Sequence, residues 1–281
     1  MNEIETILTK LLHCDRQGLY LDKHQQALNV RQLNRLEHIL QKRVSGFPLQ
    51  YLVGDVEFMG LRLRVKPGVL IPRPETEILV EEAAREIVLS AKKLCRILDI
   101  GTGSGNIAIA LAASKDLGEL AIDAVDISFV CLAAARANAR LHHLQHKIAF
   151  HHSDIFSCFE GKDDRFDFII SNPPYISDQE YTHLPPDVQQ EPASALLAAE
   201  AGFYFYRKIE EGARQYLAEH GMIFLEIGAT QGLGIKKIFS DSNTWQEVKL
   251  IRDYNGFDRV VLIRLRKRPR ALPVEKCERH A

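Results

Sequence analysis

The sequence predicts an α/β protein. It has a seven-stranded, mostly parallel sheet with an antiparallel last strand, and a small N-terminal helical domain joined to it by a β-hairpin. From residue 96 onward, short apolar runs typical of buried strands alternate with helical stretches, as in a parallel sheet covered on both faces. The last two runs are separated only by residues 253–258, too few for a crossover helix, so they must form an antiparallel hairpin at the sheet's edge. The first 50 residues show no strand pattern.

Length and composition are those of an ordinary globular protein. The 281 residues, 46% hydrophobic and 26% charged, are enough for one large domain plus a small one. A formal net charge of −1 excludes a global positive field that would attract nucleic acid. Five scattered cysteines without CxxC spacing indicate a reducing compartment, and no apolar run approaches the roughly 18 residues of a membrane span. We therefore expect a cytoplasmic protein.

Residues 1–50 are predicted to form an N-terminal helical domain. In the first twelve residues the apolar positions have helical spacing: Ile4, Ile7, Leu8, Leu11 and Leu12. A second helical stretch covers residues 24–44, and Asn34 is a candidate start of a fresh helix within it. The alternative is a helical extension packed on the main core.

Residues 51–73 are predicted to link the two parts. Val56–Phe58 and Leu61–Val65 flank Met59-Gly60, which favours a β-hairpin. A long helix follows from about Glu75 to Lys93, with acidic residues in its first turn and lysines in its last, as the helix dipole favours.

Residues 74–266 are predicted to form the main domain, and the basic residues 267–281 are expected to be a disordered tail, with an RNA contact as the minor alternative. The predicted strands are Arg96–Ile100, Ala121–Asp126, Lys147–His151, Phe166–Ser171, Met222–Ile227, Glu247–Arg252 and Arg259–Leu265. Helices are expected after Gly105, Phe129, Ala201 and Gly232.

A glycine-rich loop follows the first strand of the main domain. Its candidate ligand-binding residues are Asp99, Gly101, Thr102, Gly103, Ser104 and Gly105. The glycines allow a sharp turn and a close ligand, and the following helix offers free N–H groups. The third glycine of a dinucleotide-binding pattern is replaced by Asn106. The acidic Asp99 would repel a pyrophosphate but suits a cationic ligand such as S-adenosylmethionine.

The next two strands also end in acidic residues. Asp126, followed by Ile127, is placed to accept hydrogen bonds from both ribose hydroxyls of a nucleoside. Asp154 could accept from an adenine amino group, with Ile155 or Phe156 packing against the ring. Either aspartate alone could equally be a helix cap or a turn residue. Polar groups at four successive strand ends together are a more specific sign of a ligand site than any one of these groups alone.

The fourth strand ends in Asn172, Pro173, Pro174 and Tyr175. The prolines fix the backbone and lack N–H groups, so carbonyl acceptors point in set directions beside the asparagine amide and an aromatic ring. This arrangement suits a planar substrate group that bears an NH2. The alternative is a simple turn, since Asn-Pro often begins one.

Together these motifs resemble the class I S-adenosylmethionine-dependent methyltransferases, and more closely the bacterial release factor glutamine methyltransferase (PrmC/HemK) family. The similarity covers nearly the whole chain. Its motifs are Arg43-xx-Gly46-x-Pro48-x-Gln50-Tyr51-xx-Gly54-xxx-Phe58-x-Gly60, LIPRPETE at 70–77, DIGTGSG at 99–105, NPPYI at 172–176, Glu191-Pro192-xx-Ala195-Leu196, Glu226-x-Gly228-xx-Gln231 and Asp253-xx-Gly256-x-Asp258-Arg259. One departure is Leu197-Ala198-Ala199, where many relatives carry Asp-Gly-Gly.

The resemblance implies a Rossmann-like sheet and methyl transfer from S-adenosylmethionine to a glutamine side-chain amide in class I peptide chain release factors, with S-adenosylhomocysteine as the other product. The Asn172 oxygen and the Pro173 carbonyl would accept the two N–H bonds of the amide, beside Pro174 and Tyr175. Arg73 and Glu75 are further candidate substrate contacts. The N-terminal helices would dock the release factor. A monomer without a nucleic-acid substrate is expected.

Two other functions fit part of the pattern. An amino-methyltransferase acting on adenine or cytosine in nucleic acid would share the NPPY motif, but the near-neutral charge disfavours it. A cofactor-binding protein without catalysis would have no use for NPPY. His142 and His146 are spaced to share a helix face, but no carboxylate or cysteine completes a metal site, so none is predicted.

Overall fold

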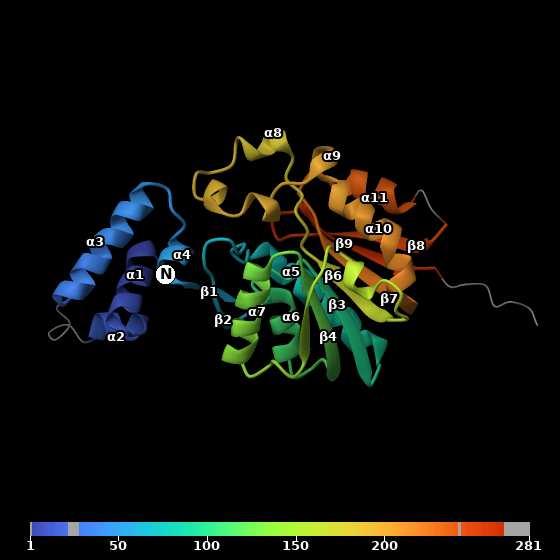
Figure 1. The fold of residues 1–281 in the computed structure, drawn as a ribbon, viewed down its shortest axis with the longest axis horizontal. Coiled ribbons are helices and arrows are strands. Elements are labelled where there is room, and N and C mark those ends of the chain that lie inside the picture. The colour runs from blue at the N-terminus through green and yellow to red at the C-terminus, as the bar shows by residue number, and fades with distance from the viewer. Residues whose placement is uncertain (1, 22–27, 241–242, 267–281) are drawn as a thin grey trace, which may run out of the picture.

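The computed structural model describes residues 2–21, 28–240 and 243–266. A helical bundle formed by the N-terminal residues lies beside a larger α/β domain, and a short hairpin connects them (Figure 1). None of the helices in these ranges is long and apolar enough to cross a bilayer. The basic tail expected at residues 267–281 lies outside the described residues.

The N-terminal bundle consists of α1 (Glu3–Leu12), α2 (Arg16–Leu21), α3 (Val30–Val44) and α4 (Leu49–Val53). Asn2 and Asn29 begin α1 and α3 with capping boxes, which satisfy backbone N–H groups that the helix leaves unpaired. The prediction that Asn34 begins a helix is therefore wrong. Residues 24–27 of the predicted second helix lie outside the described residues. The small core contains Ile7, Leu11, Ile39 and Leu52.

The predicted β-hairpin is confirmed as β1 (Asp55–Phe58) paired antiparallel with β2 (Leu61–Arg64). Met59 and Gly60 form its turn with φ of 51° and 71°, which is why a glycine is needed there. The buried Asn138 of α7 (Phe129–Leu141) fixes the hairpin to the main domain. Its Oδ1 accepts from the Arg64 N–H at 2.8 Å, and its Nδ2 donates to the Arg64 and Ser104 carbonyls.

The main sheet has the strand order β5-β4-β3-β6-β7-β9-β8. Its strands are β3 (Leu94–Ile100), β4 (Glu119–Asp126), β5 (Ile148–His152), β6 (Phe166–Ser171), β7 (Leu217–Glu226), β8 (Trp245–Arg252) and β9 (Asp258–Leu265). Strands β3 to β7 pair in parallel, and β9 lies antiparallel between β7 and the edge strand β8. The predicted terminal hairpin is thereby confirmed.

Helices cover both faces of the sheet (Figure 1). On one face are α5 (Glu75–Ser90), α6 (Asn106–Ala113) and α7 (Phe129–Leu141), and on the other α10 (Tyr204–Tyr216) and α11 (Gly232–Ser240). The long helix predicted to reach Lys93 ends at Ser90, where Ala91 takes a left-handed conformation, so its last turn carries no lysine. The short helices α8 (Asp178–Tyr181) and α9 (Ala199–Gly202) lie between β6 and α10.

Strand β6 has all six of its residues buried, because it is central and covered on both faces. Its neighbours β3 and β7 are parallel to it, so the three strands end at the same edge of the sheet. Residues that follow these strands in the chain must therefore meet, although they are far apart in sequence.

A steric prediction follows from Gly105, which begins α6 with φ of +83°. A Cβ there would lie 2.9 Å from Ile109 Cδ1 and 3.1 Å from Ala135 Cβ. We expect Gly105→Ala to lower the unfolding free energy by about 2–4 kcal/mol, from backbone strain and overpacking together.

The matched control is Gly118→Ala, since Gly118 has φ of +71° but no atom within 4 Å of an added Cβ. This substitution should lower the free energy of unfolding only by the backbone strain, about 1–2 kcal/mol. Urea unfolding of both variants measures the difference, and equal losses would show that close packing at Gly105 does not matter.

Candidate active site

A large cleft with about 1050 Å³ of empty space opens at the C-terminal edge of the sheet. The predicted cofactor residues that line it are Gly101, Gly103, Ser104, Asp126, Ile127, Asp154, Ile155 and Asn172. They come from the ends of β3, β4, β5 and β6, which are adjacent strands. The other predicted cofactor residues lie behind this lining: Asp99, Thr102, Gly105 and Phe156.

The glycine loop and Asp126 are hydrogen-bonded to each other. Asp126 Oδ2 accepts from the Gly103 N–H at 2.9 Å, and Oδ1 accepts from the Ser128 N–H at 2.8 Å. Each oxygen keeps a lone pair for a ligand hydroxyl. At Gly101, with φ of +71°, an added Cβ would meet nothing within 4 Å, so the backbone faces open space. A ligand can thus approach the loop closely while Asp126 binds it from the side.

Asp99 lies under the loop and is fully buried. Its Oδ2 accepts from Thr102 Oγ1 at 2.7 Å, but its Oδ1 has no partner among the described residues. Burial raises the pKa of Asp99 to about 7. A buried carboxylate without a full set of donors is stabilised by a nearby cation. The only basic residue in the described lining, Arg73, is paired with Glu191, so the cleft suits a cationic nucleoside better than a polyphosphate.

Phe156 does not face the cleft. It stacks on Tyr216 with 4.9 Å between ring centroids, and an added Cβ at Gly212 would lie 2.5 Å from its ring. Of the two residues considered for packing against an adenine ring, Ile155 is therefore the one in the lining.

A smaller cavity adjoins the cleft. Its lining is Leu70, Arg73, Asn172, Pro173, Tyr175, Ile176, Val188, Ala195, Leu196 and Glu226. Asn172 and Pro173 line both spaces, whereas Pro174 lines only the cleft and Tyr175 only the smaller cavity. The segment 172–175 is thus the boundary between them, and Asn172 is accessible to a ligand from each side.

A hydrogen-bond chain fixes the direction of the Asn172 amide. Asn172 Nδ2 donates to Thr76 Oγ1 at 3.0 Å, and Thr76 Oγ1 donates to Glu226 Oε2 at 2.6 Å. A hydroxyl has one hydrogen, so Thr76, which gives its hydrogen to the carboxylate, can only accept from Asn172. The nitrogen of the amide must then face Thr76. Its oxygen, without a partner among the described residues, remains the free acceptor.

Glu226 is the buried end of this chain. It is 1% exposed, and burial raises its pKa to about 7, against the opposing effects of the Thr76 hydrogen bond and the Arg259 charge. The Tyr175 hydroxyl also donates to it, at 3.4 Å. The position of Tyr175 is fixed further by Gln231, whose Nε2 donates to the Tyr175 carbonyl at 3.0 Å.

The two other predicted substrate contacts differ in position. Arg73 lines both spaces and is paired at 2.5 Å with the buried Glu191, whose other oxygen accepts from the Ile71 N–H. Glu75 is in the lining of neither space.

The roles of Thr76, Glu191 and Glu226 were not predicted. All three occur in the quoted motifs, but nothing in the sequence says that they contact each other.

His142, one of the two histidines weighed as metal ligands, bonds instead to the Arg62 carbonyl of the hairpin at 2.8 Å. Within the described ranges no group of three or more His, Cys, Asp or Glu side chains is placed to hold a metal ion.

The strand order, the glycine loop and the acidic strand ends fit an S-adenosylmethionine-dependent methyltransferase, and comparisons with known proteins show that this is the class. Residues 75–195 match the family model of the methyltransferase small domain, and residues 1–54 match that of the PrmC N-terminal domain. The fold is shared with the Thermus thermophilus 16S rRNA N2 G1207 methyltransferase solved with AdoMet and guanosine. The two are 16% identical with a TM-score of 0.54, over 75% of this chain and 50% of that one.

Two relatives identify the family more narrowly. The release factor glutamine methyltransferase of Thermodesulfovibrio yellowstonii is 36% identical over 95% of this chain and 93% of its own length. The release factor glutamine methyltransferase of Geobacter sulfurreducens is 38% identical over 92% of this chain and 87% of its own length. The chain therefore belongs to the release factor glutamine methyltransferase family.

The hydrogen-bond chain predicts the effect of Thr76→Val, which keeps the side-chain shape and removes the hydroxyl. The Asn172 amide would then lack its fixed partner, and a small misplacement of a group in an active site costs up to about 10²-fold in rate. We expect a methyl-transfer rate at saturating cofactor about 10- to 100-fold lower, with unchanged affinity for S-adenosylhomocysteine.

Thr102→Val is the matched control, because Thr102 is also buried and also donates to a buried carboxylate, that of Asp99. It should weaken cofactor binding more than it lowers the rate at saturation. Loss of cofactor affinity in Thr76→Val would contradict the assigned role.

A pH dependence follows from Glu226. With a pKa of about 7, its carboxyl is ionised above that pH and protonated below it. A protonated carboxyl can donate to Thr76, which frees the threonine hydrogen to point at Asn172. The transfer rate at saturating cofactor should therefore fall as the pH drops below about 7.

In Glu226→Gln we expect a low rate at all pH values and no such fall. Other ionisable groups near Glu226 are Tyr175, Arg259 and Glu75. Burial raises the pKa of Tyr175, so its hydroxyl stays protonated in this pH range. A fall that persists unchanged in Glu226→Gln would assign it to a different group.

Proposed function

We propose that this chain transfers a methyl group from S-adenosylmethionine to the side-chain amide nitrogen of a glutamine in class I peptide chain release factors, in support of translation termination. The observation that carries the proposal is the place of Asn172. It lies between a cleft suited to a cationic nucleoside and a second cavity, and its amide oxygen is free to accept.

The cofactor would occupy the large cleft. Gly101, Gly103 and Ser104 would contact it through the loop, Asp126 with Ile127 would bind the ribose, and Asp154 with Ile155 would bind the base. The buried Asp99 carboxyl has an oxygen without a partner among the described residues, and a positive ligand in front of the loop would favour its ionised form. When bound, S-adenosylmethionine supplies a methyl group on a positively charged sulfur and leaves as S-adenosylhomocysteine.

Asn172 and Pro173 would hold the acceptor. An amide nitrogen is a weak nucleophile, because its lone pair is delocalised into the carbonyl. The Asn172 oxygen and the Pro173 carbonyl would accept its two N–H bonds, which aligns the nitrogen toward the cleft and stabilises the positive charge that develops on it. As the N–C bond forms and the C–S bond breaks, no strong base is needed. The extra proton leaves the nitrogen afterwards, to solvent.

The N-terminal bundle is proposed to dock the release factor, since a single glutamine offers few contacts for specificity. We take residues 1–50 as this docking domain, 51–73 as the linker and 74–266 as the catalytic domain. We further propose a cytoplasmic monomer that does not act on nucleic acid, consistent with the net charge of −1.

The function is tested by incubating the protein with radiolabelled S-adenosylmethionine and, separately, a purified class I release factor, DNA and RNA. Label should enter only the release factor, and mass spectrometry should find one methyl on one glutamine. Label in nucleic acid alone would support an amino-methyltransferase of bases instead.

Asn172→Ala should lower this transfer by about 10²–10³-fold, the usual effect of removing a group that stabilises developing charge. Affinity for S-adenosylhomocysteine should change little. Asn255→Ala, in the exposed turn between β8 and β9, is the control and should be fully active. Transfer by Asn172→Ala within a few-fold of wild type would remove Asn172 from the mechanism.

A further inference from the structure

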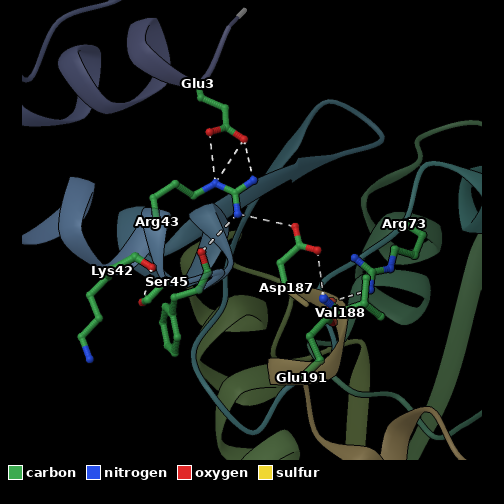
Figure 2. Close-up of polar contacts among 9 residues, drawn as sticks. Glu3, Lys42, Arg43, Ser45, Arg73, Asp187, Val188 and Glu191 are labelled. Carbon is green, nitrogen blue, oxygen red and sulfur yellow. Dashed lines mark hydrogen bonds and ion pairs between the residues drawn. The ribbon is translucent and has the colours of Figure 1, made fainter. Parts of the chain in front are cut away.

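Arg43, near the end of α3 in the N-terminal bundle, faces the loop of residues 185–198 (Figure 2). We call this loop the wall loop because it contributes to the lining of both cavities. Arg43 Nε and Nη2 donate to the carboxylate of Glu3 at 2.8–3.2 Å, which joins the end of α3 to the start of α1. On its other side, Nη1 lies 3.6 Å from Asp187 Oδ2 and donates to the Phe47 carbonyl. One guanidinium therefore connects the bundle to the wall loop.

Within five residues, the wall loop connects Asp187 by hydrogen bonds to residues at the smaller cavity. Asp187 Oδ1 accepts from the N–H of Val188, which lines the cavity, and the Glu191 N–H donates to the Val188 carbonyl at 3.0 Å. The buried Glu191 carboxylate binds Arg73 at 2.5 Å and the Ile71 N–H at 3.0 Å. Figure 2 shows this sequence of contacts from Glu3 to Arg73.

Other contacts between the bundle and the cavity wall surround Arg43. Gly46 has φ of +82°, and an added Cβ would lie 3.2 Å from Pro186 Cβ, so the turn after α3 packs closely on the wall loop. The Tyr51 hydroxyl donates to the Val69 carbonyl at 2.7 Å in a buried position. The bundle is thus in contact with two segments close to the cavity, around Val69 and around Asp187.

The Arg43–Asp187 pair is too exposed to matter much for folding. The two side chains are 28% and 38% exposed, and pairs of this kind contribute little to the free energy of unfolding. Its geometry is nevertheless specific, because a planar guanidinium that binds Glu3 with one edge has its other edge directed at Asp187. Such a contact can set an orientation without adding much stability.

We propose that Arg43 is a positioning residue for the protein substrate: through Asp187 it sets the position of the docking bundle relative to the smaller cavity. The inference rests on the proposed function, because it takes the bundle as the surface that binds the release factor. A docked substrate presents its glutamine at a fixed place relative to the bundle. If the bundle shifts relative to Val188 and Arg73, the amide reaches Asn172 less often, although the docking contacts themselves remain.

The test compares Arg43→Gln, Asp187→Asn and the double variant. Asparagine at 187 keeps an oxygen for the Val188 N–H and removes only the charge. Arg16→Gln is the matched control, because it breaks an Arg–Glu pair inside the bundle, with Glu5, that has no contact with the wall loop. For each protein we would measure the Kd for the release factor, the single-turnover methylation rate at saturating release factor and cofactor, and the melting temperature.

Each single variant should lower the single-turnover rate about tenfold, with the Kd within twofold and an unchanged melting temperature. The double variant should be no slower than the slower single one, because both changes break the same contact. The control should match wild type in rate.

Three results would overturn the inference: a raised Kd with an unchanged rate, which would make Arg43 a direct docking contact; rates equal to those of the control; or losses that multiply in the double variant. Failure of the wild-type protein to methylate the release factor would refute the proposed function itself, and is distinguishable because it appears without any substitution.

Discussion

The hydrogen bond between Asn172 and Thr76 is the contact on which the site depends. It brings together the end of β6 and the first turn of α5, and Glu226 at the end of β7 completes it. An asparagine amide is nearly symmetric in shape, so without Thr76 its oxygen and nitrogen could exchange places. With Thr76 committed to a carboxylate, only the orientation that turns the amide nitrogen toward Thr76 makes a hydrogen bond there. Asn172 therefore presents an acceptor, and not a donor, to the two spaces that it lines.

This arrangement requires an ionised carboxylate in the core. A pKa raised from 4.5 to about 7 corresponds to about 3 kcal/mol of cost in keeping Glu226 charged. This cost already includes the opposing effects of Thr76, Tyr175 and the nearby charge of Arg259, without which it would be larger. Asp99 under the glycine loop has a similar raised pKa, and it too lies directly behind a ligand site. Both spaces that meet at Asn172 therefore have a buried acid beside them: Glu226 at the smaller cavity and Asp99 under the glycine loop of the cleft.

Much of this could be predicted from the sequence. Continuous apolar runs marked the parallel strands, and a gap too short for a helix predicted the hairpin of β8 and β9. The polar groups that line the cleft follow those strands directly, so strand prediction also placed Asp126, Asp154 and Asn172. Thr76 could not be assigned a role in the same way, because its partners Asn172 and Glu226 lie 96 and 150 positions further along the chain. Such contacts depend on how the strands are ordered, which spacing alone does not show.

Local patterns failed where tertiary packing decided the outcome. Phe156 has the place in sequence of a cofactor residue, but Tyr216 of α10 offers it a ring to stack on. Asn34 resembles a helix start, yet Asn29 with Gln32 makes the better cap. The helices α2 and α4 are only six and five residues long, too short to show a helical period.

The most direct test of the central claim is a crystal structure of the protein with S-adenosylhomocysteine and a glutamine-containing peptide from a release factor. It should show Asn172 Oδ1 and the Pro173 carbonyl each within about 3 Å of the glutamine Nε2. Asn172 Nδ2 should remain on Thr76 and Thr76 on Glu226. A glutamine bound elsewhere, or an Asn172 amide turned so that its oxygen faces Thr76, would contradict it.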